Sequence, residues 1–274
     1  MIKFNYKISV LTLMVFGLMI TSSCDTNETQ QVTTFKNLVF ADEFDVNGAP
    51  NPEVWAFDLG TGSNGWGNNE LQNYTNRPEN VVVQNGYLII TARQELFQGS
   101  PFTSARLKTQ NLFSQKYGRF EARVKLPLGK GLWPAFWMLG SNFDQVGWPQ
   151  CGEIDIMEYL GNKPTEVFGT IHGPGFAGAE SISKFYTLPT GRFDTDFHVF
   201  GVEWTESYIN WYVDDVLYSQ KTRKQVEQEG GEWVFNNDFF MILNIAVGGN
   251  LPGSPDANTM FPQRMLVDYV RVYN

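Results

Sequence analysis

Cysteine is nearly absent from this chain of 274 residues, which contains only Cys24 and Cys151. Because Cys24 lies in a segment typical of a leader, a framework of internal disulfide bonds is excluded. Basic residues are also few, with 20 Lys and Arg against 29 Asp and Glu and a formal net charge of −9. An acidic surface repels phosphate backbones, so we expect no nucleic-acid partner.

Helical periodicity is scarce as well, and only residues 222–230 have the pattern of a helix. Short runs rich in Val, Ile, Phe and Tyr recur instead, separated by Gly, Asn, Asp and Pro. The clearest predicted strands are a hairpin over 81–92, alternating runs at 118–126 and 266–273, two strands within 199–218, and a continuous apolar run at 239–247. Strands at this spacing predict an all-β sandwich or jelly roll, without an internal repeat.

The first residues are typical of a targeting segment. Lys3 and Lys7 precede a mostly apolar stretch, 8–20, and small residues precede Cys24. The pattern is similar to a bacterial lipoprotein signal, although Thr21 stands where Leu is usual; an ordinary secretory signal cut nearby is the alternative. The apolar stretch is too short to predict a transmembrane helix. We expect an exported protein, lipid-anchored in the bacterial cell envelope, with a signal peptide over 1–23, a lipidated Cys24 and polar tether over 24–36, and one domain over 37–274.

Three acidic residues lie within six positions of the segment WPQCGEIDIMEY, residues 148–159. On a helix, Glu153 and Glu158 would lie about 140° apart around the axis and could not share a site. On a strand, Glu153 and Asp155 face the same side, whereas Glu158 is at an odd offset and faces the other. One β-bulge near Ile156-Met157 would bring Glu158 to the side of the other two, and bulges are common beside active sites.

Glycosidic cleavage needs two carboxyl groups in different protonation states. One attacks or stabilises the anomeric carbon, and the other protonates the leaving oxygen. A third carboxyl group would interact with both and help to separate their pKa values. Glu153, Asp155 and Glu158 supply such a set. Two alternatives stay open: a solvent-facing acidic strand, and a calcium-binding trio, although the D-x-[DN]-x-[DN]-G loop is absent.

Aromatic and polar residues around the acids suit a sugar ligand. Trp133 and Trp137 are four residues apart, so on a strand they face the same side and can stack on pyranose rings. Amides in the segment 63–74 match sugar hydroxyls, because each amide both donates and accepts. Further candidates are Trp148, just before the acids; Arg106, for which a surface salt bridge is the alternative; and His172, for which a structural hydrogen bond to the backbone is the alternative.

Several segments together resemble glycoside hydrolase family 16, specifically its bacterial laminarinase-like β-1,3-glucanases. The matching pieces are GWGNNELQNYT, GLWPAFWMLG, WPQCGEIDIMEYLG, GTIHGPG, FGVEWTESYINWYVDD, NIAVGGNLPGSPD and VDYVRVY. They follow the family's order from about residue 40 to the C-terminus. The resemblance implies a bent antiparallel β-sandwich, a concanavalin-like jelly roll, with a concave substrate cleft.

The resemblance also implies roles for individual residues. Glu153 is the expected nucleophile, Glu158 the acid/base and Asp155 the assisting carboxyl group. The E-x-D-x-x-E form is the bulged version of the motif, and lichenases of the family usually have the shorter E-x-D-x-E. Positions that match the sugar cleft are Asn69, Arg106, Trp133, Trp137, Trp148 and His172. Positions that match one structural calcium ion are Glu43, the carbonyl of Gly86, and Asp268, and no cofactor is implied for catalysis.

The function expected from these residues and this resemblance is endo-acting, retaining hydrolysis of β-1,3-glucan, extending to mixed-linkage β-1,3-1,4-glucan. Leu251 stands where many members carry Trp, which leaves the number of sugar subsites open. The alternatives are the same machinery acting on another polysaccharide, such as an agar-type galactan, and a non-catalytic glucan-binding lipoprotein. We expect a monomer whose partners are a glucan and, through the lipid, a membrane.

Overall fold

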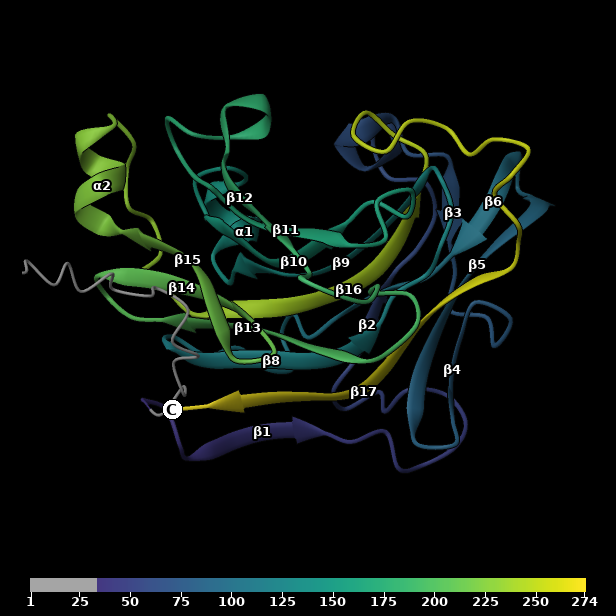
Figure 1. Ribbon diagram of the computed structural model, residues 1–274, viewed down its shortest axis with the longest axis horizontal. Helices are drawn as coiled ribbons and strands as arrows, with labels where there is room; N and C mark the ends of the chain where they lie inside the picture. Colours follow the sequence, from purple (N-terminus) through teal and green to yellow (C-terminus); the bar gives the residue numbers. More distant parts are fainter. Residues whose placement is uncertain (1–33) are drawn as a thin grey trace, which may run out of the picture.

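The computed structural model describes residues 34–274, and the predicted signal peptide and Cys24 lie outside these residues. The described chain forms two sheets packed face to face (Figure 1). Neighbouring strands are antiparallel, except that β3 and β6 run parallel. The predicted all-β sandwich is therefore confirmed. No helix of this part of the chain is long and apolar enough to cross a membrane.

The larger sheet has ten strands, in the order β15-β14-β13-β8-β17-β5-β6-β3, with β1 beside β17 and β4 beside β5. Its strands are β1 (Leu38–Asp42), β3 (Gln72–Tyr74), β4 (Val81–Gln84), β5 (Tyr87–Phe97), β6 (Ser100–Ser104), β8 (Gly118–Lys125), β13 (His198–Trp204), β14 (Tyr208–Val213), β15 (Val216–Thr222) and β17 (Gln263–Tyr273).

The smaller sheet has seven strands, in the order β12-β11-β10-β9-β16-β7-β2. Its strands are β2 (Ala56–Asp58), β7 (Arg106–Lys108), β9 (Leu132–Gly140), β10 (Glu153–Tyr159), β11 (Glu166–His172), β12 (Ile182–Thr187) and β16 (Phe239–Val247). The helical segments are short: η1 (Gly65–Asn69), α1 (Phe143–Val146), η2 (Gly178–Glu180) and α2 (Arg223–Gln228).

Local sequence signals explain several of these elements. Asn85 and Gly86 both have positive φ, 56° and 80°, as a two-residue turn between β4 and β5 requires. The predicted helix near 222–230 is α2, and it begins at a capping box in which Thr222 and Gln225 each accept from the other's backbone N–H. The predicted hairpin and helix are thus both present.

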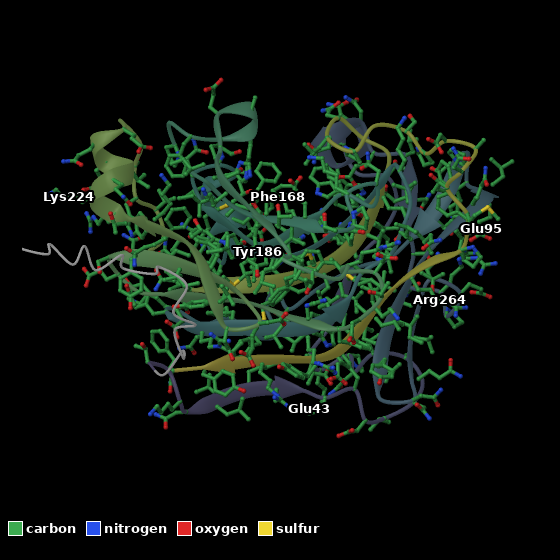
Figure 2. The ribbon with its side chains drawn as sticks, viewed as in Figure 1. Glu43, Glu95, Phe168, Tyr186, Lys224 and Arg264 are labelled. Carbon is green, nitrogen blue, oxygen red and sulfur yellow. The ribbon has the colours of Figure 1, made fainter. Side chains whose placement is uncertain are left out.

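The core lies between the two sheets, where side chains fill the space (Figure 2). On β8, Phe120, Ala122 and Val124 are fully buried and alternate with charged residues, as the period of two predicted. Strand β16 is buried along its whole length, in agreement with its continuous apolar run. It curves strongly within the smaller sheet, between β9 and β7 (Figure 1). The outer side of this sheet carries the candidate site, and we call it the open face.

Candidate active site

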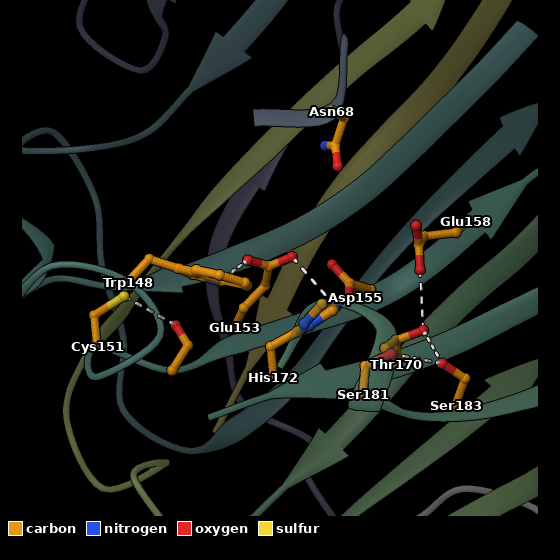
Figure 3. A network of polar contacts seen from close by, with 12 residues as sticks. Asn68, Trp148, Cys151, Glu153, Asp155, Glu158, Thr170, His172, Ser181 and Ser183 are labelled. Atoms are coloured by element: carbon orange, nitrogen blue, oxygen red, sulfur yellow. Dashed lines mark hydrogen bonds and ion pairs between the residues drawn. The ribbon is translucent and has the colours of Figure 1, made fainter. Parts of the chain in front are cut away.

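Strand β10 carries the three acidic residues, and its register shifts between Asp155 and Glu158 relative to both neighbouring strands. Against β9, the pairing advances two residues on β10, from Asp155 to Met157, while β9 advances by only one. Ile156 and Met157 are consecutive, yet both are buried in the core. The predicted bulge is therefore confirmed, and it turns Glu158 onto the open face with Glu153 and Asp155 (Figure 3).

Indole N–H groups bind two of the carboxylates. Trp148 Nε1 donates to Glu153 Oε2 at 2.6 Å, and Trp133 Nε1 donates to Glu158 Oε1 at 3.0 Å. The second oxygen of Glu158 accepts from the Thr170 hydroxyl at 3.0 Å (Figure 3). Hydrogen bonds to both of its oxygens fix the orientation of the Glu158 carboxyl group. Trp133, one of the two tryptophans predicted to stack on sugar rings, and Trp148 therefore hold the carboxylates in place.

His172 faces the other two acids from the end of β11. Its Nε2 lies 3.3 Å from Asp155 Oδ2 and 3.7 Å from Glu153 Oε1. Its Nδ1 accepts a hydrogen bond from the Gly178 backbone N–H at 3.1 Å. Because an accepting ring nitrogen carries no proton, the neutral ring has its hydrogen on Nε2 and presents a donor to the carboxylates.

Burial and mutual repulsion raise the pKa values of all three carboxyl groups. Burial, followed by the charge of Asp155, raises the pKa of Glu153 to about 8. Burial is also the largest cause for Glu158, whose pKa rises to about 7 although the Thr170 hydrogen bond lowers it. The pKa of Asp155 lies well above its ordinary range, because of burial first and the charge of Glu158 second. The site therefore keeps at least one proton near neutral pH, as general acid catalysis requires.

The same site also contains the one group of three potential metal ligands found among residues 34–274. Glu153, Asp155 and His172 each place a ligand atom within 4.8 Å of the others. A metal-bound imidazole must offer a lone pair, but the hydrogen bond from Gly178 to Nδ1 leaves the proton on Nε2. The arrangement suits hydrogen bonding among acids better than metal binding.

His172 lies on β11, on one side of β10. Arg106 on β7 and Trp137 on β9 lie on the opposite side of β10, in a stack that includes Trp66. The Arg106 guanidinium lies 4.7 Å from the ring centroid of each tryptophan, so it is held between two indoles. Its Nε also pairs with Asp58 Oδ2 at 2.9 Å. Trp137 Nε1 donates to Asn244 Oδ1 at 2.7 Å, which fixes the indole on the open face. The salt bridge considered as the alternative for Arg106 is present, together with the aromatic stack.

Asn69 lies on η1. It has a positive φ of 56°, and its Nδ2 donates to Asn250 Oδ1 at 2.9 Å. Asn250 N also donates to Asn68 O, so two loops distant in sequence are joined here. Leu251, next to this link, is exposed. The structure thus gives Asn69 a contact between loops, and it brings Trp133, Trp148 and His172 directly to the acids.

Three residues of the site escaped the sequence interpretation: Thr170, Trp66 and Asn244. Thr170 lies two positions before His172 on β11, so period two would have placed it on the same face. Trp66 and Asn244 carry no comparable signal, because their roles depend on contacts with residues far away in the sequence.

The groups predicted to bind calcium lie on the larger sheet, on β17, next to β1 and in the turn that contains Gly86. The two oxygens of Glu43 accept from Arg271 at 2.8 and 2.9 Å, and Asp268 Oδ2 accepts from Arg123 at 2.6 Å. Calcium takes six to eight oxygen ligands. Here both carboxylates are paired with arginines, so a calcium ion would have to compete with these pairs.

Comparisons with known proteins agree with this geometry. The family model described as glycosyl hydrolases family 16 matches residues 68–271. A β-glucanase of Rhodothermus marinus is 45% identical over 245 residues, which cover 86% of this chain and 84% of that protein. The structure of an endo-β-1,3-glucanase from Pyrococcus furiosus is 51% identical with a TM-score of 0.84, and the match covers 86% of this chain and 94% of that one. The laminarinase catalytic domain of Thermotoga maritima is 50% identical with a TM-score of 0.83, and the match covers 87% and 98%.

Proposed function

The chain belongs to the glycosyl hydrolases of family 16, and from this premise we propose that it cleaves β-1,3-glucan chains internally with retention at the anomeric carbon. Mixed-linkage β-1,3-1,4-glucan is the second substrate that we propose. The chain is a glycoside hydrolase that needs no catalytic cofactor. The observation that carries the proposal is the bulge in β10, which brings Glu153, Asp155 and Glu158 onto one face.

The proposed reaction has two displacements. In the first, a Glu153 oxygen bonds to the anomeric carbon, the glycosidic bond breaks, and Glu158 gives its proton to the leaving oxygen. In the second, the Glu158 carboxylate takes a proton from water, and the water oxygen displaces Glu153. A pKa of about 7 lets Glu158 hold the proton that the first step consumes.

The neighbours of Glu153 suit a nucleophile. Trp148 and His172 both favour its charged form and lower its pKa against the effect of burial. Burial first, and the charge of Glu158 second, hold the pKa of Asp155 well above its ordinary range, so Asp155 keeps a proton near neutral pH. With Asp155 protonated, its charge no longer opposes ionisation of Glu153, which is the carboxylate that attacks.

The test is hydrolysis of laminarin, lichenan and agarose by the wild type, Glu153→Gln and Glu158→Gln. Reducing-sugar release from laminarin that both substitutions abolish supports the proposal, while Glu79→Gln, at an exposed site, serves as the matched control. Proton NMR early in the reaction should show the β-anomer of the product. Early α-anomer would reject retention, and faster release from agarose would favour a galactan as the substrate.

A non-catalytic glucan-binding protein is the alternative from a different class. The three apposed carboxyl groups argue against it, because a binding protein gains nothing from burying acids whose pKa values are raised. Binding of laminarin by the wild type without any turnover would support that alternative instead.

We also propose that the protein is exported and lipid-anchored in the bacterial cell envelope and acts as a monomer. The support for export and lipid anchoring is the sequence alone: Lys3 and Lys7, the apolar stretch 8–20, and Cys24. A radioactive fatty acid should be incorporated into the wild-type protein and not into Cys24→Ser. Light scattering on the domain without its leader measures the oligomeric state.

One structural calcium ion, near Glu43, Gly86 and Asp268, is a further proposal that rests on the family resemblance. Its binding would have to displace the arginines that now pair with the two carboxylates. Melting temperatures measured with calcium and with a chelator decide the matter. A rise with calcium that Asp268→Asn removes supports the ion, and equal melting temperatures reject it.

A further inference from the structure

The open face continues past the acids onto β11 and β12, the last two strands at one edge of the smaller sheet. Glu158 pairs with Phe168 on β11, and Phe168 pairs with Phe185 on β12. Thr170 likewise pairs with Ser183. Paired residues of antiparallel strands project to the same face, so these side chains share the face of Glu158.

Two phenylalanines form an aromatic row that crosses the strands. Their ring centroids are 4.9 Å apart, and Phe168 is buried while 49% of Phe185 is exposed. Lys163 Nζ lies 5.4 Å from the centroid of the Phe185 ring and pairs with Glu166 at 2.7 Å. Phe185 is therefore in contact with Phe168 and Lys163, and about half of the residue is exposed to solvent.

A row of hydroxyl groups runs beside the aromatic row. Thr170 Oγ1 donates to Glu158 and lies 2.9 Å from Ser183 Oγ, and Ser181 Oγ follows at 3.5 Å (Figure 3). Each hydroxyl group can both donate and accept. An aromatic surface bordered by hydroxyl groups matches a pyranose ring, which has an apolar C–H face and a polar rim.

We propose that Phe185, supported by Phe168 and bordered by Ser183, forms a sugar-binding subsite for the β-glucan chain. Strand β12 lies two strand spacings from β10, about 10 Å, so the subsite contacts a sugar other than the one being cleaved. Trp137 and Arg106 lie on β9 and β7, on the opposite side of β10. A chain that crosses the strands at the acids is thus bound on both sides of the cut. This inference rests on the proposed function, because it assumes the same ligand.

The kinetic test compares wild type and Phe185→Ala on laminarin and on β-1,3-linked oligosaccharides of increasing length. Loss of an aromatic contact should lower kcat/KM about three- to tenfold on long substrates, mainly through KM. The shortest substrates that are cleaved should show no change, and Phe185→Trp should retain the activity on long ones. Leu96→Ala, at an exposed apolar residue of the other sheet, is the control.

Equal kcat/KM for Phe185→Ala and wild type at every length would overturn the subsite. An equal loss at every length would overturn it too, because it would indicate a structural effect on the acids. Melting temperatures show whether each variant is folded.

A binding measurement separates this inference from the proposed function. Glu153→Gln, alone and combined with Phe185→Ala, is run through gels that contain laminarin, and retardation is compared. Weaker retardation of the double variant supports the subsite even if the wild type proves inactive on laminarin, a result that would refute the proposed function alone. Equal retardation, or none for Glu153→Gln, overturns the subsite.

Discussion

Replacing Glu153 with Gln should stabilise the protein, and more so at alkaline than at acidic pH. Burial first, and the charge of Asp155 second, raise the pKa of Glu153 from 4.5 to about 8. A group with a raised native pKa binds its proton more tightly in the folded state, so the free energy of unfolding falls as pH rises from 4.5 to 8. Gln has nearly the same shape and no charge, so the variant escapes this loss.

The magnitude follows from the pKa shift. The difference between 8 and 4.5 is 3.5 units, and at ~1.36 kcal/mol per unit it corresponds to about 5 kcal/mol above pH 8. Only 16% of the Glu153 side chain is exposed, so solvent screens the effect weakly. This value is an upper limit, because Asp155 and Glu158 also redistribute their protons when one charge is removed. We expect about 2–5 kcal/mol at pH 8.5 and less than about 1 kcal/mol at pH 5.

Denaturant unfolding at pH 5 and pH 8.5 measures this difference for the wild type and Glu153→Gln. Glu79→Gln, which removes an exposed carboxylate of the same type, controls for net charge and should show no such dependence. A gain in stability for Glu153→Gln that is the same at both pH values, or larger at pH 5, would refute the argument from buried charge. The expected result is typical of active sites, where function and stability are in conflict.

Three further results are expected. In Thr170→Val, loss of the hydrogen bond that lowers the pKa of Glu158 should move the pH profile of kcat/KM upward by about 0.5–1 unit; an unmoved profile would contradict the assignment of Glu158 as the acid. Trp148→Phe keeps an aromatic ring but loses the donor to Glu153, so kcat should fall about tenfold, and an unchanged kcat in steady-state kinetics would exclude this role. Trp66→Ala uncovers one face of the stacked arginine and should raise KM about three- to tenfold with an unchanged pH profile; a shifted profile would mean that the stack acts on the acids.

The sequence predicted the features that depend on neighbours along the chain. Side chains alternate along a strand, so Glu158 can share a face with Glu153 and Asp155 only if one bulge lies between them. The register of β10 shifts at that place. The pair Asn85-Gly86 likewise predicted a tight turn, because Asn and Gly tolerate the positive φ that this turn requires at both residues. Such features follow from the geometry of a single strand or turn.

Features that depend on the order of strands in the sheet were not predictable from the sequence. Trp66, Arg106 and Trp137 form one stack, yet they come from η1, β7 and β9. Periodicity shows which face of a strand is buried, but it does not show which strand lies beside it. The hydrogen bond between Thr170 and Glu158 was missed for that reason, since it requires β11 to lie next to β10.

The bulge in β10 is stabilised by the core as well as required by the reaction. Without it, strict alternation after Asp155 and Ile156 would place Met157 on the open face and Glu158 in the core. Exposing Met157 would lose about 2–3 kcal/mol of hydrophobic stabilisation, and a carboxyl group without partners in the core would cost several more. With the bulge, Ile156 and Met157 are both at most 1% exposed, and Glu158 meets its indole and hydroxyl donors. The two consecutive apolar residues therefore select the register that brings the acids together, so the catalytic geometry follows from the packing of the core.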